Sequence, residues 1–418
     1  MRIPGGVTSN VRFFPPYPLF MERAAGSKIY DVDGREYIDY CLAFGPLVAG
    51  HGHPRIVEAV RTELDRRGTM IFGTPTELEL TLADRLGRLI PSAEMVRFTN
   101  SGTESTLHAI RLARGATGRS RVVKFEGHYH GGHDAVLVGL DAARPARPAN
   151  DGIPPSARDE TLVLPFNDVA AVAALHGEDD IAAVIVEPVA RGAIAAEPRF
   201  LQELRALTAR RGIVLIFDEV VSWPRVALGG AQAALGVTPD LTALGKAIGG
   251  GLPMGAIVGR RDVMEHFAPR TARGDAGVGA GFNRPYVFHG GTYNGTPIAL
   301  AAGLALLNLL EEPGVYDGLL ASGERMRAGL RALFARCNVT AQVIGHGAAF
   351  DFYFTDQPIR SVQEIAASDL ARREAVDYGL LERGIFNSPL HRFHVSLAHT
   401  ADDLERTLTA IDQTIMQP

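Results

Sequence analysis

The chain has 418 residues, of which 46% are hydrophobic and 21% charged, a composition typical of a folded protein with two or three structural units. Its 42 basic and 47 acidic residues leave a formal net charge of −5, and no block of like charge indicates a nucleic-acid or membrane-surface partner, so a small-molecule partner is expected. Two cysteines, Cys41 and Cys337, are too few for a disulfide framework or a cysteine metal site.

The N-terminal segment, residues 1–48, is rich in proline, glycine and aromatic residues. It contains no apolar run that could act as a signal sequence, so we expect a cytoplasmic protein. Residues Lys28 to Tyr40 alternate apolar and polar side chains around Asp33-Gly34, and this pattern predicts a β-hairpin. We expect this segment to form part of a small domain.

Residues 49–300 are predicted to form a large α/β domain. Helical stretches alternate there with short, continuously apolar runs such as MVRF, RVVKF, AAVIV and IVLIF, which are typical of a parallel sheet covered on both faces. Pro198–Arg211 is predicted as a helix that ends at Gly212. Ligands bind at the carboxyl ends of such strands, where Glu187 and the pair Asp218-Glu219 are expected.

The segment Asn100–Glu104 follows the strand MVRF and opens a helix. Ser101, Gly102 and Thr103 would therefore present backbone N–H groups and hydroxyls at the positive end of the helix, which suits a phosphate. An ordinary N-capped turn explains the same residues equally well.

The segment FEGHYHGGHD, residues 125–134, carries His128, His130 and His133. Their spacing fits neither the HExxH nor the zinc-finger pattern, so we expect no metal and treat the histidines as polar loop residues. Tyr129 is the better functional candidate, since its aromatic face could stack on a flat heterocycle.

Three further segments carry candidate chemistry. Asp218 ends the strand IVLIF, where a carboxylate can pair with a protonated ring nitrogen or cap the next helix. Lys246 lies in the apolar, glycine-rich segment LTALGKAIGGG, which would desolvate its amine, lower its pKa and make it a nucleophile; the alternative is an ordinary surface charge. Thr292, in HGGTYNGTP, offers a second hydroxyl for a phosphate.

Residues 301–418 are predicted to form a C-terminal α+β domain, with strands in QVIGHGAAFDFYF and FHVSLA. The apolar stretch Pro297–Leu310 is too short to span a bilayer and carries Asn308, so we expect a buried helix and no membrane association.

The order of SGTE, FEGHYHG, VEP, DEV, the lysine at 246 and GGTYNGTP resembles the class III aminotransferases of fold type I, and most resembles their glutamate-1-semialdehyde 2,1-aminomutase subgroup. The likeness runs from GGVTSNVR at residues 5–12 through TPTELEL at 74–80 to SLAHT at 396–400. It implies a large, mostly parallel, seven-stranded-type sheet domain and a smaller α+β domain built from the N- and C-terminal segments.

The resemblance also implies pyridoxal 5′-phosphate as the cofactor and a role for each candidate residue. Lys246 would hold the cofactor as a Schiff base and move the proton, while Asp218 would pair with the ring nitrogen. Val220 and Tyr129 would pack on the two faces of the ring. The phosphate would be held by Ser101, Gly102 and Thr103, and by Thr292 from a neighbouring subunit, which implies a homodimer with shared sites.

The substrate region departs from the aminomutase pattern. VEPVARGAIAAE lacks the asparagine of those enzymes, FNSPLHRFH lacks their loop glutamate, Val138–Arg158 is unlike their gating loop, and Ser222–Arg225 replaces a TGFR-like step. Arg12 matches an arginine that meets the substrate carboxylate, although a surface arginine is the alternative. Trp223 could add an apolar wall, although a lone tryptophan is more often structural.

These departures favour an aminotransferase that moves an amino group between an amino acid or amine and an oxo acid, in two half-reactions through pyridoxamine phosphate. An aminomutase-like isomerase that uses the same Lys246 and Asp218 is the alternative. A non-catalytic protein that binds pyridoxal phosphate is the second alternative, because fold does not fix function.

Overall fold

The computed structural model of the chain describes residues 2–13, 18–140, 151–269 and 286–416. The chain forms two compact units, here called unit 1 (residues 1–62, 192–194 and 304–418) and unit 2 (residues 63–191 and 195–303). The first boundary between them, Thr62/Glu63, falls inside helix α1 (Pro54–Arg67), which begins in unit 1 and ends in unit 2.

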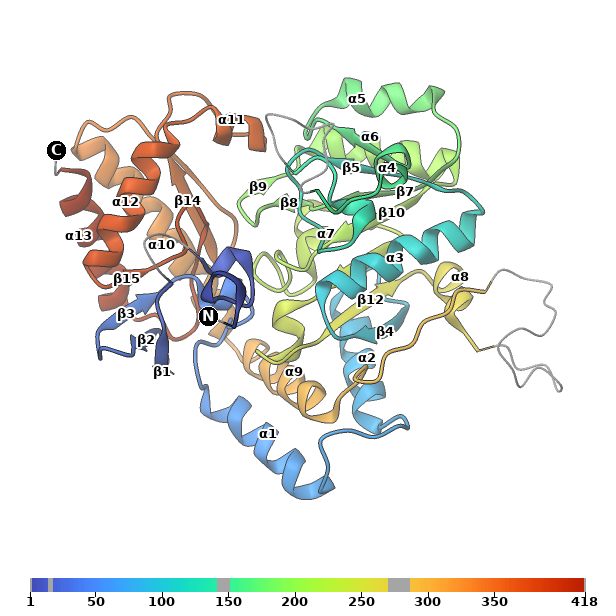
Figure 1. Ribbon diagram of the computed structural model, residues 1–418, viewed down its shortest axis with the longest axis horizontal. Coiled ribbons are helices and arrows are strands. Elements are labelled where there is room, and N and C mark those ends of the chain that lie inside the picture. Colours follow the sequence, from blue (N-terminus) through green and yellow to red (C-terminus); the bar gives the residue numbers. More distant parts are fainter. Residues whose placement is uncertain (1, 14–17, 141–150, 270–285, 417–418) are drawn as a thin grey trace. The chain divides into compact units, whose positions relative to one another are not determined.

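Unit 2 is built on a seven-stranded sheet (Figure 1). Its order is β4 (Met95–Thr99), β12 (Gly255–Gly259), β11 (Leu241–Leu244), β10 (Val214–Asp218), β7 (Ile181–Val186), β5 (Arg121–Phe125) and β6 (Thr161–Leu164). The five strands from β11 to β6 are parallel, while β12 runs antiparallel to both of its neighbours. The expected mostly parallel sheet is confirmed.

Burial explains why these segments form central strands. Every residue of β7 and β10 is buried, as the continuously apolar runs predict for strands covered on both faces. Helix α3 (Gly102–Thr117) packs its apolar side on the sheet, and α6 (Pro198–Arg211) contacts β10 and ends at Gly212, whose φ of 60° is the left-handed conformation of a helix C-cap.

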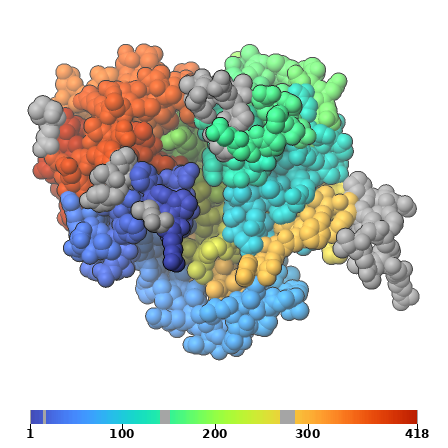
Figure 2. Space-filling view, viewed as in Figure 1, coloured from blue at the N-terminus to red at the C-terminus, as the bar shows by residue number. Residues whose placement is uncertain are grey.

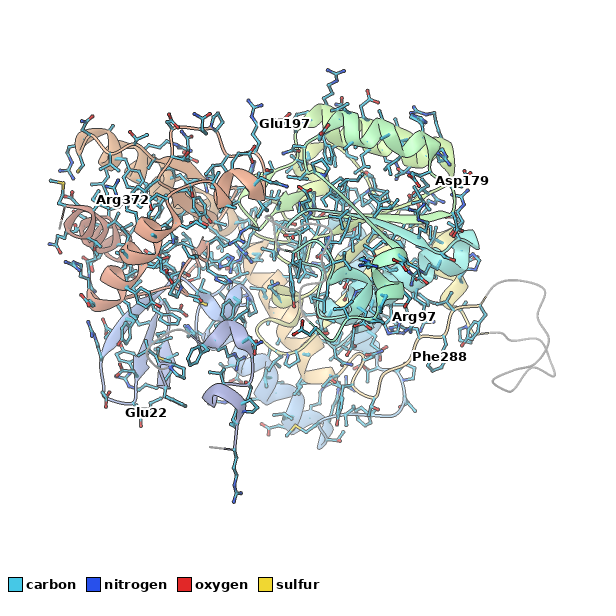
Figure 3. All side chains as sticks on the ribbon, turned by 45° about the horizontal axis from the view of Figure 1, so that its top comes forward. Glu22, Arg97, Asp179, Glu197, Phe288 and Arg372 are labelled. Atoms are coloured by element: carbon cyan, nitrogen blue, oxygen red, sulfur yellow. The ribbon has the colours of Figure 1, made fainter. Side chains whose placement is uncertain are left out.

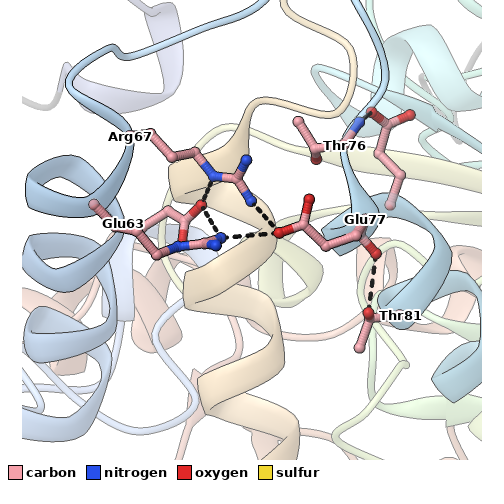
Figure 4. Close-up of polar contacts among 7 residues, drawn as sticks. Glu63, Arg67, Thr76, Glu77 and Thr81 are labelled. Carbon is pink, nitrogen blue, oxygen red and sulfur yellow. Dashed lines mark hydrogen bonds and ion pairs between the residues drawn. The ribbon is translucent and has the colours of Figure 1, made fainter.

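The remaining elements of unit 2 are short. They are α2 (Glu77–Leu89), α4 (Pro155–Asp159), α5 (Val169–Ala174), α7 (Gly230–Leu235), α8 (Arg261–Met264), β8 (Val189–Ala190) and β9 (Ile194–Ala195), whose first residue belongs to unit 1. Figure 4 shows how the last turn of α1 is joined to the first turn of α2: Arg66 and Arg67 each pair with both Glu63 and Glu77.

Unit 1 combines the two ends of the chain. β1 (Met21–Ala25), β2 (Lys28–Asp31) and β3 (Glu36–Asp39) form an antiparallel sheet, so the predicted hairpin is confirmed. β15 (Ile385–Phe386) adds to it parallel to β3. A second sheet contains β13 (Gln342–Ile344), β14 (Ala349–Tyr353) and β16 (Phe393–His394). Helices α10 (Val315–Arg336), α11 (Val362–Ala366), α12 (Leu370–Glu382) and α13 (Ala401–Ile415) complete the unit.

Helix α9 (Pro297–Leu310) is the expected apolar helix, and most of its leucines are buried. Over the described residues, no single helix is long and apolar enough to cross a membrane; α9 and α10 pass that test only as a pair, bent by 79° at the break between them.

Candidate active site

The site is built at the carboxyl ends of the parallel strands of unit 2, and its first part is the start of α3. The helix begins at Gly102, and the Ser101 hydroxyl accepts a hydrogen bond from the backbone N–H of Glu104 at 3.2 Å. Ser101 therefore caps the helix as expected of an N-capped turn. The first turn also presents the positive end of the helix dipole, and the phosphate site there stays a prediction.

Three sequence motifs meet at this helix end through two glycines and a valine. A side chain at Gly102 would bring its Cβ within 2.7 Å of Val220 Cγ1, and one at Gly245 would lie 3.0 Å from Gly102 Cα and 3.1 Å from Val220 Cγ1. Only glycine fits at such short range. This close packing places Lys246, the residue after Gly245, beside the start of α3.

Lys246 is also the lysine whose setting suits a reacting amine. The chain has three lysines. Lys28 in unit 1 pairs with Asp403 at 3.5 Å, and the buried Lys124 donates to the carbonyl groups of residues 136 and 138. Lys246 is only partly buried and has a φ of 48°, a left-handed backbone that non-glycine residues adopt rarely and mostly at functional sites.

Asp218 lies buried at the end of β10 and is held by two hydrogen bonds. Its Oδ2 is 2.8 Å from His130 Nδ1, and its Oδ1 accepts the backbone N–H of Val220 at 3.0 Å. His130 is itself almost completely buried. The sequence analysis treated His130 as a polar loop residue and missed this contact. The available signal was that the loop after β5 and the end of β10 lie on the same edge of a parallel sheet.

The loop that carries Tyr129 lies against α3. Gly131 has a φ of 101°, and a Cβ on it would lie 2.7 Å from Thr103 Cα; the N–H of Gly132 donates to Thr103 Oγ1 at 3.3 Å. The Tyr129 side chain is 57% exposed, and burial, followed by the nearby Asp218, raises the pKa of its hydroxyl. Its ring is thus available to a ligand.

The three histidines of this loop have separate partners. His128 accepts from the N–H of Glu187, His130 bonds Asp218, and His133 Nε2 lies 3.3 Å from Thr106 Oγ1. Within the described ranges, no group of three or more histidine, cysteine, aspartate or glutamate residues could hold a metal ion.

Thr292 lies in an exposed turn and has no hydrogen-bond partner among the residues that the structure describes. The turn is anchored by Asn294, whose Oδ1 accepts from Asn100 Nδ2 at 2.9 Å. Figure 2 shows the yellow-orange segment 286–296 on the surface of the molecule, and Phe288, labelled in Figure 3, is 60% exposed there.

Trp223 does not occupy the position expected of a pocket wall. Its side chain is 1% exposed, and its indole N–H donates to the carbonyl of Leu228 at 2.9 Å. A buried tryptophan whose N–H has a hydrogen-bond partner is part of the core, so we do not expect Trp223 to contact the substrate.

Arg12 lies in unit 1 and lines a pocket of about 470 Å³. Its guanidinium donates to Thr8 Oγ1 at 3.0 Å, and no carboxylate pairs with it among the described residues. The walls are largely apolar and include Val11, Leu19, Met21, Phe44 and Phe386. This pocket offers a small molecule an apolar surface together with the charged side chains of Arg12, Arg23, Glu22 and Asp39.

The unit 2 site fits the pyridoxal phosphate that the resemblance implies. The tight packing of Gly102, Val220 and Gly245 leaves no space for an added Cβ and holds the backbone before Lys246 against the start of α3. A buried carboxylate, Asp218, is oriented by two hydrogen bonds, and a helix N-terminus lies beside a lysine. These groups match a ring nitrogen, a phosphate and an aldehyde.

Comparison with known proteins agrees with this geometry. The family model "Aminotransferase class-III" matches residues 11–415. Among curated relatives, the chain is 45% identical to a glutamate-1-semialdehyde 2,1-aminomutase of Methanothermobacter thermautotrophicus, over 99% of this chain and 96% of the relative. It is 42% identical to the enzyme of that name from Methanosarcina acetivorans, over 98% and 94%.

Solved structures with the same fold include three that bear on function. An omega-transaminase from Sphaerobacter thermophilus has a TM-score of 0.92 at 38% identity, over 99% of this chain and 94% of that one. A beta-phenylalanine aminotransferase from Variovorax paradoxus has 0.88 at 37%, over 99% and 91%. A glutamate-1-semialdehyde-aminomutase from Pseudomonas aeruginosa in complex with PMP has 0.84 at 28%, over 96% and 88%.

Proposed function

The chain belongs to the class-III aminotransferase family, and we propose that it uses pyridoxal 5′-phosphate to move an amino group on a small carboxylate-bearing substrate. The convergence of Gly102, Val220, Gly245 and the buried Asp218 around Lys246 carries this proposal. Relatives of this fold have been solved as a "transaminase with PLP bound" and in complex with PMP, which supports the same cofactor here.

When bound, the cofactor supplies an aldehyde that takes up an amine and a protonated ring that accepts the electron pair left by a departing proton. The residues of the chain would orient the ring, transfer the proton and bind the phosphate. Asp218 would orient the ring by pairing with its nitrogen, and His130 and Val220 N–H hold the Asp218 carboxylate in place. The Lys246 amine would take a proton from the substrate carbon and return it. Ser101, at the N-cap of α3, and the first helical residues Gly102 and Thr103 would bind the phosphate.

The leading candidate reaction is the 2,1-aminomutase reaction on glutamate 1-semialdehyde. The sequence analysis ranked this isomerase second, behind amino transfer between two molecules. Full-length curated relatives at 42–45% identity carry the aminomutase name, and this favours the isomerase. Arg12, with no carboxylate partner among the described residues, would receive the substrate carboxylate.

Transamination is the second candidate, because specific observations favour it. The omega-transaminase structure has a higher TM-score and identity than the aminomutase structure. The asparagine and loop glutamate of the aminomutase pattern are also missing from VEPVARGAIAAE and FNSPLHRFH.

A turnover experiment without a second substrate separates the two reactions. The holoenzyme is incubated with glutamate 1-semialdehyde, and in parallel with β-phenylalanine, without any other oxo compound. An aminomutase converts many equivalents of the semialdehyde to its positional isomer and forms no oxo product from β-phenylalanine. A transaminase forms one equivalent of oxo product per site from β-phenylalanine and resumes when an oxo acid is added. Lys246→Ala is the control and should support neither reaction.

We further propose a homodimer in which Thr292 reaches the phosphate of a second copy. Thr292 is exposed and without a hydrogen-bond partner among the described residues. Phe288 and Tyr293, on the same segment as Thr292, are exposed apolar side chains, and the exposed Leu80 follows Glu79, which lies close to Gly295. Such exposed apolar residues are typical of a protein–protein contact.

A further inference from the structure

Two loops of unit 2 are joined by a reciprocal pair of hydrogen bonds outside the residues assigned so far. The backbone N–H of Glu187, just after β7, donates to His128 Nδ1 at 3.1 Å. In return, Glu187 Oε1 accepts the backbone N–H of Tyr129 at 2.9 Å. One residue thus binds the loop after β5 through both its main chain and its side chain. We call this pair of contacts the Glu187–His128 clamp.

The clamp is buried and well packed. His128 is completely buried and Glu187 is 5% exposed. The imidazole of His128 lies edge-on to Phe166, with the ring centroids 4.6 Å apart. Burial, then the neighbouring His130 and Lys124, holds the pKa of His128 well below its usual value, so the ring is neutral. Since Nδ1 accepts the Glu187 N–H, the ring proton lies on Nε2.

The second carboxylate oxygen of Glu187 is used as well. Glu187 Oε2 accepts the backbone N–H of Arg191 at 3.0 Å, at a residue whose φ is 53°. The carboxylate therefore connects Glu187 to Arg191 within the loop after β7, and it joins this loop to the backbone of Tyr129. Hydrogen bonds to a carboxylate are stronger than those between neutral groups, and desolvation strengthens them further.

The clamp fixes the main chain on one side of Tyr129, and other contacts fix it on the other side. The carbonyl of His130 accepts from Thr106 Oγ1 at 2.5 Å, and the His130 ring bonds Asp218. Between these anchors the Tyr129 ring remains 57% exposed. The loop has positive φ at Gly127 (71°) and Gly131 (101°), and glycines make a loop flexible unless it is anchored.

We propose that Glu187 and His128 are positioning residues that hold Tyr129 at a fixed distance from Asp218, so that its ring is already placed to pack on the cofactor. The inference rests on the proposed role of Tyr129 as the ring platform. Without the clamp, binding the cofactor would also have to order the loop, and that entropic cost would appear as weaker binding.

A double-mutant cycle on cofactor affinity tests this. Dissociation constants for pyridoxal phosphate are measured by equilibrium dialysis for the native chain, Glu187→Ala, Tyr129→Ala and the double variant. Because Glu187→Ala removes a charged hydrogen bond, we expect its dissociation constant to be about tenfold larger than that of the native chain. If Glu187 acts through Tyr129, the same change should have less than about a twofold effect in the Tyr129→Ala background.

A second measurement does not involve the cofactor. In the apoprotein, backbone amide hydrogen exchange in residues 126–132 should be faster in Glu187→Ala than in the native chain. Glu178→Ala, which removes an exposed partner of Arg121, is the matched control and should change neither measurement. If Glu187→Ala does not fold, Glu187→Gln is used in the same cycle, since its amide keeps one acceptor but opposes the Arg191 N–H with a donor.

The outcomes are distinct. A tenfold effect of Glu187→Ala that persists in the Tyr129→Ala background shows that Glu187 does not act through Tyr129 and overturns the inference, as does unchanged affinity in Glu187→Ala. Unchanged affinity in Tyr129→Ala alone instead removes the proposed role of Tyr129 in cofactor binding, which is a separate failure.

Discussion

Lys124 and Lys246 show how two lysines of one unit acquire different properties. Lys246 follows Gly245 in a left-handed turn and is partly exposed at the site. Lys124 points from the middle of β5 into the protein, is completely buried, and donates to two backbone carbonyls at 2.8 and 2.6 Å. Burial lowers the pKa of Lys124 to about 7, against a small opposing effect of Glu187.

This shift predicts a pH-dependent stability. The pKa of Lys124 is about 7 in the folded chain and 10.5 as an ordinary lysine, so between these values the unfolded chain binds more protons and stability rises with pH. Below pH 7 the cost of burying the amine is fully present. Relative to the native chain, Lys124→Met should therefore gain about 2 kcal/mol of unfolding free energy as the pH falls from 9 to 6.

Urea denaturation at the two pH values measures this difference. The lost hydrogen bonds to the carbonyls of residues 136 and 138 lower stability equally at both values, so only the change with pH reports the amine. Lys28→Met, at a partly exposed site, is the control for removal of a lysine. A difference between Lys124→Met and the native chain that stays constant with pH would contradict the shifted pKa.

At the scale of elements, the site depends on how the loop after β5 lies on the start of α3. Gly131 makes this contact with its backbone, close to Thr103. The other contacts between the two elements are hydrogen bonds from Gly132 N–H to Thr103 Oγ1 and from Thr106 Oγ1 to the His130 carbonyl. A shift of this loop would therefore move Tyr129 and His130 together.

Gly131→Ala should weaken cofactor binding. The new Cβ would lie 2.7 Å from Thr103 Cα in a backbone with a φ of 101°, so the loop must move away from the start of α3, where we propose that the phosphate binds. We expect at least about a tenfold increase in the dissociation constant for pyridoxal phosphate, from strain of 1–3 kcal/mol at such a position.

Gly118→Ala is the control for backbone strain without a steric clash. Gly118 has a φ of 69° and ends α3, but a Cβ there would meet no atom within 4 Å. It should lower thermal stability while leaving cofactor affinity unchanged. Equal losses of affinity in the two variants would show that the contact between Gly131 and Thr103 has no specific role in the site.

At the scale of the whole molecule, the question is whether one chain completes its own site. Lys246, Asp218 and the start of α3 belong to unit 2 of one chain. Thr292 lies in a surface turn whose Asn294 is hydrogen-bonded to Asn100, the residue that precedes Ser101 and the proposed phosphate-binding turn. If Thr292 contacts the phosphate in a second copy, the hydrogen bond between Asn100 and Asn294 holds two parts in place. One is the start of α3 in the subunit's own site, and the other is the turn with the Thr292 that it contributes to its partner's site.

Mixing two inactive variants tests the shared site. Lys246→Ala lacks the amine and Thr292→Ala lacks the hydroxyl, so each homodimer should have little activity. A heterodimer would contain one site free of both changes, because each site draws Lys246 from one chain and Thr292 from the other. Full exchange in an equal mixture should restore roughly a quarter of the native activity, given a symmetric dimer.

Subunit exchange is verified with two affinity tags. Proven exchange without any recovery of activity would exclude a contribution of Thr292 in trans. Sedimentation of each variant shows whether the change has altered the oligomeric state instead. A monomeric native chain with full activity would remove the dimer proposal altogether.

The sequence alone determined the architecture of unit 2 and the family. Continuously apolar runs fix buried parallel strands because both faces of such strands must be covered, and this holds for β7 and β10. Gly102, the glycine-rich segment around Lys246 and the order of the motifs also indicated the cofactor site. These signals are local, since each depends on a residue and its near neighbours in the chain.

Contacts between distant segments were decided only by the tertiary structure. His130 is hydrogen-bonded to Asp218, 88 positions away in the chain. Glu187 accepts the backbone N–H of Tyr129, 58 positions away. Nothing in the local sequence of either residue of a pair specifies its partner. Trp223 could be placed in a pocket or in the core from its sequence, and only packing puts it in the core. The physical reason is that hydrogen bonding and burial depend on which strand ends lie together, and this order, β10 next to β7 next to β5, is a property of the folded sheet.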